Sequence, residues 1–213
     1  LTLLVEGDAT EQAHYEALRR QALRDAERAL NNASPGQAQL NILAQLTRLR
    51  RAACDPRLVT PDLALGAAGG AKVQAFARLA TELVANGHKA LVFSQFVDFL
   101  ALLKAPLEAA GIRFQYLDGS TPAAERSARV AAFQAGVGEL FLISLKAGGF
   151  GLNLTVADYV VITDPWWNPA AEDQDSGRAH RIGQQRPVTV YRLVHRGTLE
   201  EKMKPWLQPY HDA

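Results

Sequence analysis

The sequence predicts an α/β fold with a doubly wound, mostly parallel sheet that is covered by helices on both faces. Segments such as Leu140–Ser144 and Tyr159–Thr163 are short and continuously apolar, which is typical of strands buried on both faces. Segments with apolar residues at helical spacing alternate with them along the chain. Glycine and proline residues mark the junctions, as they do between the elements of βαβ units.

The first sixty residues are expected to form a strand and two helices. Leu1–Glu6 has the composition of a short strand, and helical spacing then covers residues 11–30 and 37–54. The second helix ends in a basic stretch with Arg48, Arg50 and Arg51. These arginines either complement the dipole at the helix C-terminus, which is the favoured interpretation, or contact nucleic acid.

The Gly/Ala-rich segment 61–71 is the best boundary in the chain, and it separates a strand-and-helix extension (1–60) from the main domain (72–205) and its tail (206–213). The main domain is expected to alternate between the two kinds of element. Its expected helices cover 72–85, 96 to a stop at Gly111, and 121–134, and its expected strands cover 89–93, 113–117, 140–144, 159–163 and 188–194.

Composition restricts the class of protein. An apolar share of 48% is ample for a core, and a formal net charge of +1 means that any affinity for nucleic acid comes from local patches. Cys54 is the only cysteine, which excludes an intramolecular disulfide and favours a reducing compartment. No apolar run approaches the roughly 18 residues of a membrane span, so no membrane partner is expected. The chain begins with Leu1, which suggests a fragment of a longer protein.

The most specific stretch is DPWWNPAAEDQDSGRAHRIGQQR, residues 164–186, which contains the pattern Q-x-x-G-R-x-x-R. Arg178 and Arg181 are three residues apart, so they are neighbours on one face of a helix. No acidic residue occurs between Ser176 and Thr198. Two guanidinium groups without a local carboxylate fit phosphate oxygens, although a solvated basic helix has the same pattern.

This stretch resembles the last motif of the superfamily-two helicases, and its flanking residues are those of the SWI/SNF-like DNA-dependent ATPases. The resemblance covers most of residues 1–205 and implies the second of two RecA-like lobes. It implies that Arg178 and Arg181 reach the triphosphate of ATP held by the other lobe, with Gln174 beside them as a third catalytic residue. Gly177 stands where the family most often has an acidic residue, and is expected to lie at the nucleotide.

Ligands of parallel sheets bind in the loops that follow the carboxyl ends of the strands. Ser94 and Gln95 form the first of these loops. Ser94 is expected to be a helix N-cap, and the resemblance also places both residues near the path of the DNA. Ser120 and Thr121, in the second loop, have the composition of a turn, with contact to the phosphate backbone as the functional alternative.

The third loop is rich in glycine and matches the family pattern S-x-x-A-G-G-x-G-L-N-L. The resemblance implies that this loop lies between nucleotide and DNA. The residues expected at the nucleotide are Gly148, Gly149, Gly151 and Asn153, and those expected at the DNA are Ser144 and Lys146, the latter with a solvated lysine as the alternative. In the fourth loop Trp166 is expected to pack, and Trp167 either packs or contacts the DNA minor groove.

The chain lacks a G-x-x-x-x-G-K-[ST] loop and a D-E-x-H motif. We therefore expect ATP and Mg²⁺ only in the full-length protein, held mainly by its first lobe, and no cofactor, metal or activity in this fragment. The expected function is that of a double-stranded-DNA translocase lobe that remodels protein–DNA complexes. Its partners would be the N-terminal lobe, DNA and a DNA-bound protein, in a bacterial nucleoid or in a nucleus.

Two other classes of function were weighed. A degenerate RecA-like module that only binds DNA or protein would have no need of Gln174, Arg178 and Arg181 in this pattern. A dinucleotide-dependent oxidoreductase lobe would carry G-x-G-x-x-G after an early strand, with an acidic residue about 20 positions later, and the sequence has no such pattern.

Overall fold

The structure is a computed structural model, and it describes residues 1–145, 154–165 and 187–203. The described strands form one sheet in the order β1-β6-β5-β2-β4-β3, and every pair of neighbours is parallel. The strands are β1 (Thr2–Val5), β2 (Ala90–Ser94), β3 (Phe114–Leu117), β4 (Leu140–Ser144), β5 (Tyr159–Ile162) and β6 (Thr189–His195). The predicted parallel α/β sheet is confirmed.

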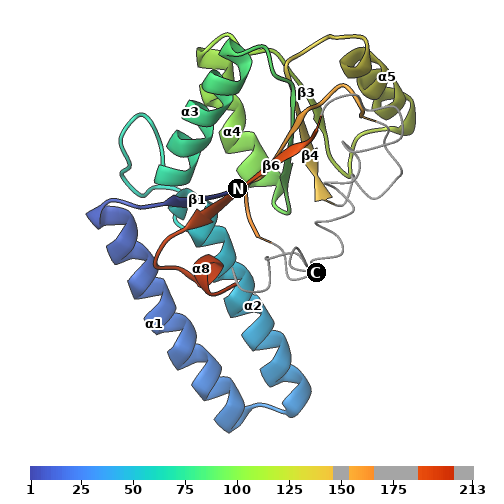
Figure 1. The fold of residues 1–213 in the computed structure, drawn as a ribbon. Helices are drawn as coiled ribbons and strands as arrows, with labels where there is room; N and C mark the ends of the chain where they lie inside the picture. The colour runs from blue at the N-terminus through green and yellow to red at the C-terminus, as the bar shows by residue number, and fades with distance from the viewer. Residues whose placement is uncertain (146–153, 166–186, 204–213) are drawn as a thin grey trace, which may run out of the picture.

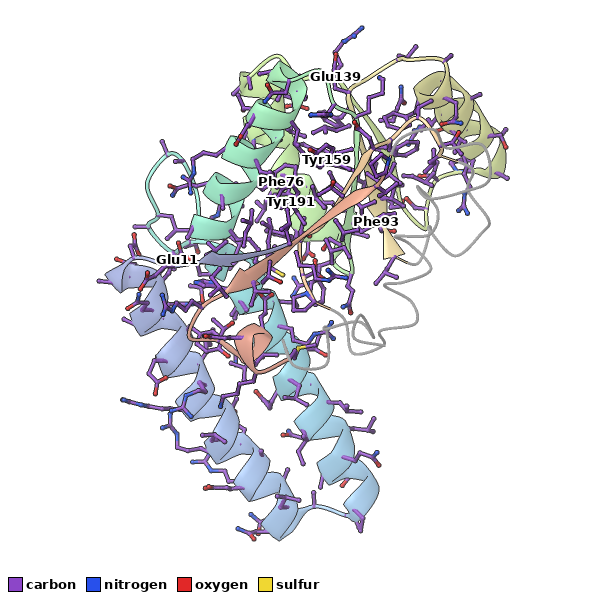
Figure 2. The ribbon with its side chains drawn as sticks, in the orientation of Figure 1. Glu11, Phe76, Phe93, Glu139, Tyr159 and Tyr191 are labelled. Atoms are coloured by element: carbon purple, nitrogen blue, oxygen red, sulfur yellow. The ribbon has the colours of Figure 1, made fainter. Side chains whose placement is uncertain are left out.

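Helices cover both faces of this sheet (Figure 1). α3 (Ala71–Ala85) and α4 (Val97–Ala109) lie on one face, and α5 (Ala123–Gln134) lies on the other. Successive residues of a strand point to opposite faces, so Val92 belongs to the same core cluster as Phe76 of α3, and Phe93 to the same cluster as Phe133 of α5. Figure 2 shows Phe76 and Phe93 in their places. The continuously apolar strands follow from this two-sided burial.

Helices α1 (Ala9–Asn32) and α2 (Pro35–Cys54) form an antiparallel hairpin that projects away from the sheet (Figure 1). Asp8 caps α1 by accepting a hydrogen bond from the backbone N–H of Glu11 at 2.9 Å. The two helices hold each other through Tyr15 and Ala22 from α1 and Leu49 from α2, among other residues of a separate small core. Both helices were predicted to within two residues at each end.

Two features were not predicted. β1 joins the edge of the sheet by pairing with β6, with Thr2 opposite Arg192 and Val5 opposite His195. A short helix, α8 (Leu199–Met203), follows β6 and packs against α2. Both features bring the two ends of the described chain together, because the N-terminal strand lies beside the strand that precedes α8.

Smaller details refine the predicted boundaries. α4 continues through Pro106 and ends at Ala109, just before the predicted stop at Gly111. α5 begins at Ala123, two residues after its predicted start, with Pro122 at the N-cap position. A 3-10 turn, η1 (Pro56–Leu58), follows α2 where the sequence predicted a stop. Within the described ranges, no helix combines the length and the apolar composition that crossing a membrane requires.

Candidate nucleotide and DNA interface

The carboxyl ends of β2, β4 and β5 lie side by side because these strands are neighbours in the sheet. Ser94, at the end of β2, is in register with Ser144 at the end of β4, and Phe93 is in register with Ile162 of β5. The chain therefore leaves the sheet at three adjacent points along one edge. In sequence, the glycine-rich loop follows β4, and the tryptophan and arginine stretch follows β5.

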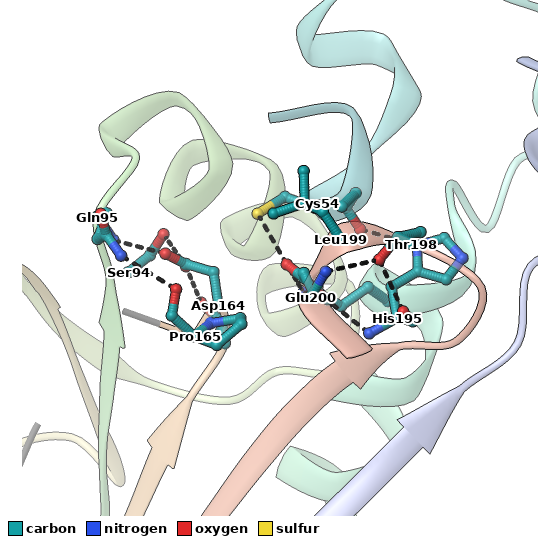
Figure 3. A network of polar contacts seen from close by, with 12 residues as sticks. Cys54, Ser94, Gln95, Asp164, Pro165, His195, Thr198, Leu199 and Glu200 are labelled. Atoms are coloured by element: carbon teal, nitrogen blue, oxygen red, sulfur yellow. Dashed lines mark hydrogen bonds and ion pairs between the residues drawn. The ribbon is translucent and has the colours of Figure 1, made fainter. Parts of the chain in front are cut away.

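Asp164 is the polar centre of this edge, with a side chain that is only 2% exposed. Its Oδ1 accepts a hydrogen bond from the hydroxyl of Ser94 at 2.5 Å, and its Oδ2 accepts one from the backbone N–H of Gln95 at 3.1 Å. The hydroxyl of Thr163 lies 2.9 Å from Oδ1 as well. These contacts fix the carboxylate and tie the end of β5 to the end of β2 (Figure 3).

Ser94 does not occupy the N-cap position that was expected for it. The N-cap of α4 is Phe96, which makes no side-chain capping bond. The Ser94 hydroxyl accepts a hydrogen bond from the N–H of Phe96 at 3.0 Å and gives its own proton to Asp164. The physical reason is that a short hydroxyl side chain at this turn has a buried carboxylate within reach, and a charge-assisted bond is stronger than a neutral one.

Gln95 links three segments of the chain. Its Nε2 donates to the carbonyl of Pro165 at 3.2 Å, and its Oε1 accepts a hydrogen bond from the guanidinium of Arg50 in α2. The Arg50 guanidinium also lies over the ring of Phe96, 5.5 Å from its centroid. Burial lowers the pKa of Arg50, although a guanidinium stays charged at neutral pH.

The neighbouring Arg51 makes a different set of contacts. It forms an ion pair with Asp98 of α4 and donates to the carbonyl of Leu58 at 3.2 Å. Arg50 and Arg51 thus have tertiary partners at the start of α4, which the helix-dipole interpretation did not foresee. Arg48, in contrast, is exposed.

Ser120 and Thr121 form the predicted turn. Asp118 Oδ1 accepts hydrogen bonds from the hydroxyl and the N–H of Ser120 at 2.5 and 2.8 Å, and the hydroxyl of Thr121 accepts one from the N–H of Asp118 at 3.1 Å. The bonds from Ser120 are the main reason that the pKa of Asp118 is lowered. Ser120 is exposed and Thr121 is buried, at the same edge of the sheet as Ser94.

Ser144 is 1% exposed, and its hydroxyl has no hydrogen-bond partner among the residues that the structure describes. The other predicted site residues lie outside the described ranges, so their roles stay predictions. They are Lys146, Gly148, Gly149, Gly151, Asn153, Trp167, Gln174, Gly177, Arg178 and Arg181.

A second buried polar cluster lies beside the first (Figure 3). Lys72 Nζ is 2.6 and 2.7 Å from the two carboxylate oxygens of Glu200, and both side chains are almost fully buried. Glu200 also accepts a hydrogen bond from the N–H of His195 at 2.9 Å. Burial raises the pKa of the Cys54 thiol next to it, so this thiol packs in the core as a neutral group.

Comparison with known proteins identifies the family to which this fold belongs. The model of the helicase conserved C-terminal domain matches residues 71–183. The chain belongs to this family. The helicase C-terminal lobe is of the SWI/SNF type, since the solved structure of the Sulfolobus solfataricus SWI2/SNF2 ATPase core in complex with double-stranded DNA aligns with 97% of it, at 28% identity and a TM-score of 0.82, over 43% of that chain.

Proteins of similar sequence support the same family assignment. The lobe is 35% identical over 199 residues, 92% of its length, to the putative ATP-dependent helicase/translocase YwqA of Bacillus subtilis. It is 49% identical over 117 residues, 54% of its length, to the DNA repair protein RAD5 of Cryptococcus neoformans. These matches span 22% and 10% of the two relatives, so the helicase C-terminal lobe corresponds to a small part of each.

Sequence patterns did not predict the contacts of four residues in the two polar clusters, namely Asp164, Arg50, Lys72 and Glu200. Asp164 directly follows a predicted buried strand, and the rule that ligands and polar groups gather at strand ends was the signal that could have found it. The other three have no such local signal, since each pairs with a residue far away in sequence.

Proposed function

We propose that this helicase C-terminal lobe is the second motor lobe of an ATP-dependent translocase on double-stranded DNA, which remodels protein–DNA complexes. The observation that carries the proposal is the adjacency of the ends of β2, β4 and β5. Because of it, two stretches of the chain start from one edge of the sheet, beside Ser94 and Gln95. They are the glycine-rich stretch 146–153 and the stretch 166–186, which contains Gln174, Arg178 and Arg181.

The comparisons support this proposal. YwqA is named as a helicase/translocase, and the Sulfolobus core was solved with double-stranded DNA. The chain itself lacks the phosphate-binding and magnesium-binding motifs, so the first lobe would hold ATP and Mg²⁺. The arginines of this lobe would then stabilise charge on the triphosphate, an effect worth about 10³ to 10⁵ in rate for an arginine finger. Such a protein acts where DNA is, in a nucleoid or a nucleus.

The test is the DNA-stimulated ATPase activity of the complete two-lobe protein. We expect Arg178→Ala and Arg181→Ala to lower kcat by about 10³-fold or more, while affinity for DNA changes little. Arg113→Ala is a matched control, because the Arg113 side chain is 69% exposed and forms a surface ion pair with Glu139 just before β3 and β4, away from their carboxyl ends.

Two outcomes would contradict the proposal. Normal turnover in Arg181→Ala would remove the arginine-finger role. A wild-type two-lobe protein that binds DNA but never hydrolyses ATP would favour the alternative, a degenerate RecA-like module that only binds DNA or protein.

A further inference from the structure

The side-chain amide of Gln95 bridges two parts of the lobe that are distant in sequence. Its oxygen accepts from Arg50, near the end of α2, and its nitrogen donates to the carbonyl of Pro165, just beyond β5. A primary amide is suited to this position because it is neutral and both donates and accepts. The bridge therefore connects the α1–α2 hairpin to the chain where it leaves the sheet towards residues 166–186.

The attachment at the Pro165 end is rigid. The preceding residue, Asp164, is buried and held by the hydroxyl of Ser94 and by the backbone N–H of Gln95. Pro165 adds a fixed φ angle. With Asp164 held and φ of Pro165 restricted, the hydrogen bond to the Pro165 carbonyl controls the remaining freedom, the orientation of the next peptide group.

Holding α2 in place does not account for the bridge. Arg51 already ties α2 to α4 through Asp98 and to η1 through the carbonyl of Leu58. Arg50 lies over the same Phe96 ring as Arg51, and its guanidinium donates to the side-chain amide of Gln95. The two adjacent arginines thus have different roles. Arg51 attaches α2 to α4, and Arg50 binds the Gln95 amide that holds the Pro165 carbonyl.

We propose that Arg50 is a positioning residue for ATP hydrolysis, which acts through Gln95 to set the direction in which the chain leaves β5. This inference rests on the proposed function, because it assumes that residues 166–186 carry the arginines of the motor. It assigns the α1–α2 hairpin a mechanical link to that stretch. It also gives Gln95 a role inside the lobe, in addition to the contact with DNA predicted from the family resemblance.

The test uses the complete two-lobe protein and measures kcat, the KM for ATP, the DNA concentration for half-maximal stimulation, and Tm. We expect Arg50→Ala and Gln95→Ala each to lower the DNA-stimulated kcat about tenfold to a hundredfold, the range for a small misplacement of a catalytic group. The KM for ATP should stay within about twofold. The double variant should be no slower than the slower single variant, since both changes break one bridge.

Further variants separate the two halves of the bridge. Gln95→Glu has the same shape and keeps an acceptor for Arg50, but it sets a carboxylate oxygen against the Pro165 carbonyl, so kcat should fall as in Gln95→Ala. Arg50→Lys keeps a donor and should restore part of the loss. Arg51→Ala is the matched control, because it removes the tether to Asp98 without touching Gln95, and it should keep the wild-type kcat.

Several results would overturn the inference. Independent, multiplicative losses in the double variant would show that Arg50 does not act through Gln95. Equal losses of kcat and Tm in Arg50→Ala and Arg51→Ala would reduce both arginines to structural roles. A higher DNA requirement in the Gln95 variants with Arg50→Ala unchanged would leave Gln95 as a DNA contact alone. Arg181→Ala, measured in the same series, shows separately whether the proposed function itself fails.

Discussion

At the residue scale, the least expected feature is a lysine without solvent exposure. Lys72 is 0% and Glu200 is 2% exposed, and their charged groups lie 2.6 Å apart. Burial acts against both charges and is the largest single influence on Lys72, but the attraction and hydrogen bonds of Glu200, together with Cys54 and Asp164, exceed it, so the pKa of Lys72 is raised. The pair joins the first turn of α3 to α8, two elements that no sequence pattern linked.

Removing one charge of this ion pair should lower the free energy of unfolding far more than replacing both residues by apolar ones. Glu200→Gln leaves the buried ammonium group without a countercharge, and we expect a loss of about 3–5 kcal/mol in the free energy of unfolding. The double variant Lys72→Met with Glu200→Leu removes both charges and should recover most of that loss. Urea denaturation of the three proteins measures this, and a double variant less stable than Glu200→Gln would contradict the prediction.

His195 should make the stability of the lobe depend on pH. Its Nδ1 lies 2.8 Å from the carbonyl oxygen of Ala53, so that nitrogen carries the proton and donates it, and burial lowers the pKa of the ring. The hydrogen bond to the Ala53 carbonyl raises this pKa and Lys72 lowers it. The carboxylates of Glu11 and Asp55 also raise it, without reversing the direction.

The lowered pKa of His195 determines how the free energy of unfolding changes with pH. The ordinary pKa of histidine is 6.5, and above this pH the ring is neutral in both the folded and the unfolded protein. Below it, His195 of the unfolded chain binds a proton, whereas His195 of the folded lobe stays neutral to a lower pH. The free energy of unfolding should fall as the pH drops below 6.5, by at most about 1.4 kcal/mol per pH unit from this group. His195→Gln, which keeps a donor for Ala53, should flatten the slope between pH 7 and 5.5. An unchanged slope would assign it to other groups, such as His14, whose pKa burial also lowers.

At the element scale, the start of α3 is fastened to the N-terminal helices. Asp55 accepts hydrogen bonds from the Arg57 side chain at 2.9 and 3.0 Å and from the N–H of Gly70 at 3.3 Å. Glu11 accepts one from the N–H of Ala71 at 2.6 Å. The last two backbone N–H groups of the Gly/Ala-rich segment 61–71 therefore donate to two carboxylates, one in α1 and one directly after α2.

Gly70 is required here for space and not for its backbone angle. A Cβ at this position would lie 2.6 Å from Asp55 Oδ2, which is buried and held by Arg57. Gly70→Ala should lower the free energy of unfolding by about 1–3 kcal/mol, as overpacking does. Gly66→Ala, in the same segment, meets no atom within 4 Å and should leave stability within about 0.5 kcal/mol. Thermal unfolding of both variants checks this, and equal Tm values would show that Asp55 moves aside without cost.

At the scale of the whole molecule, the N-terminal sixty residues and the rest of the lobe share many contacts. β1 pairs with β6, Tyr15 accepts a hydrogen bond from the N–H of Leu199 at 2.9 Å, and Ala53 binds His195. The tip of the α1–α2 hairpin lies away from these contacts, and Leu30 and Leu40 there are more than 60% exposed. The contacts lie where the hairpin meets the sheet.

This distribution predicts how the lobe unfolds. Amides near Leu49 and Ala53 in α2 should exchange with solvent hydrogen at the same opening free energy as those of Val92 in the central strand, because they open only when the whole lobe unfolds. Amides near Leu30 and Leu40 should exchange at a much lower free energy. Native-state hydrogen exchange measures all of them, and exchange near Ala53 several kcal/mol below Val92 would mean that the hairpin unfolds by itself.

The order and type of most elements, the parallel sheet and the family could be predicted from the sequence. These properties depend on periodicity within about twenty residues and on motifs that are contiguous in the chain, such as the run from Asp164 to Arg186. α8 is the exception, because five residues are too few for a helical period to stand out.

The long-range contacts between side chains, in contrast, could be found only in the folded structure. Arg50 and Gln95 are 45 residues apart in sequence, Ser94 and Asp164 are 70 apart, and Lys72 and Glu200 are 128 apart. Each contact depends on the order and register of parallel strands, and local patterns carry no information on either. β1 shows the same limit, since its composition predicts a strand, but β6, the strand with which it pairs, lies nearly two hundred residues away.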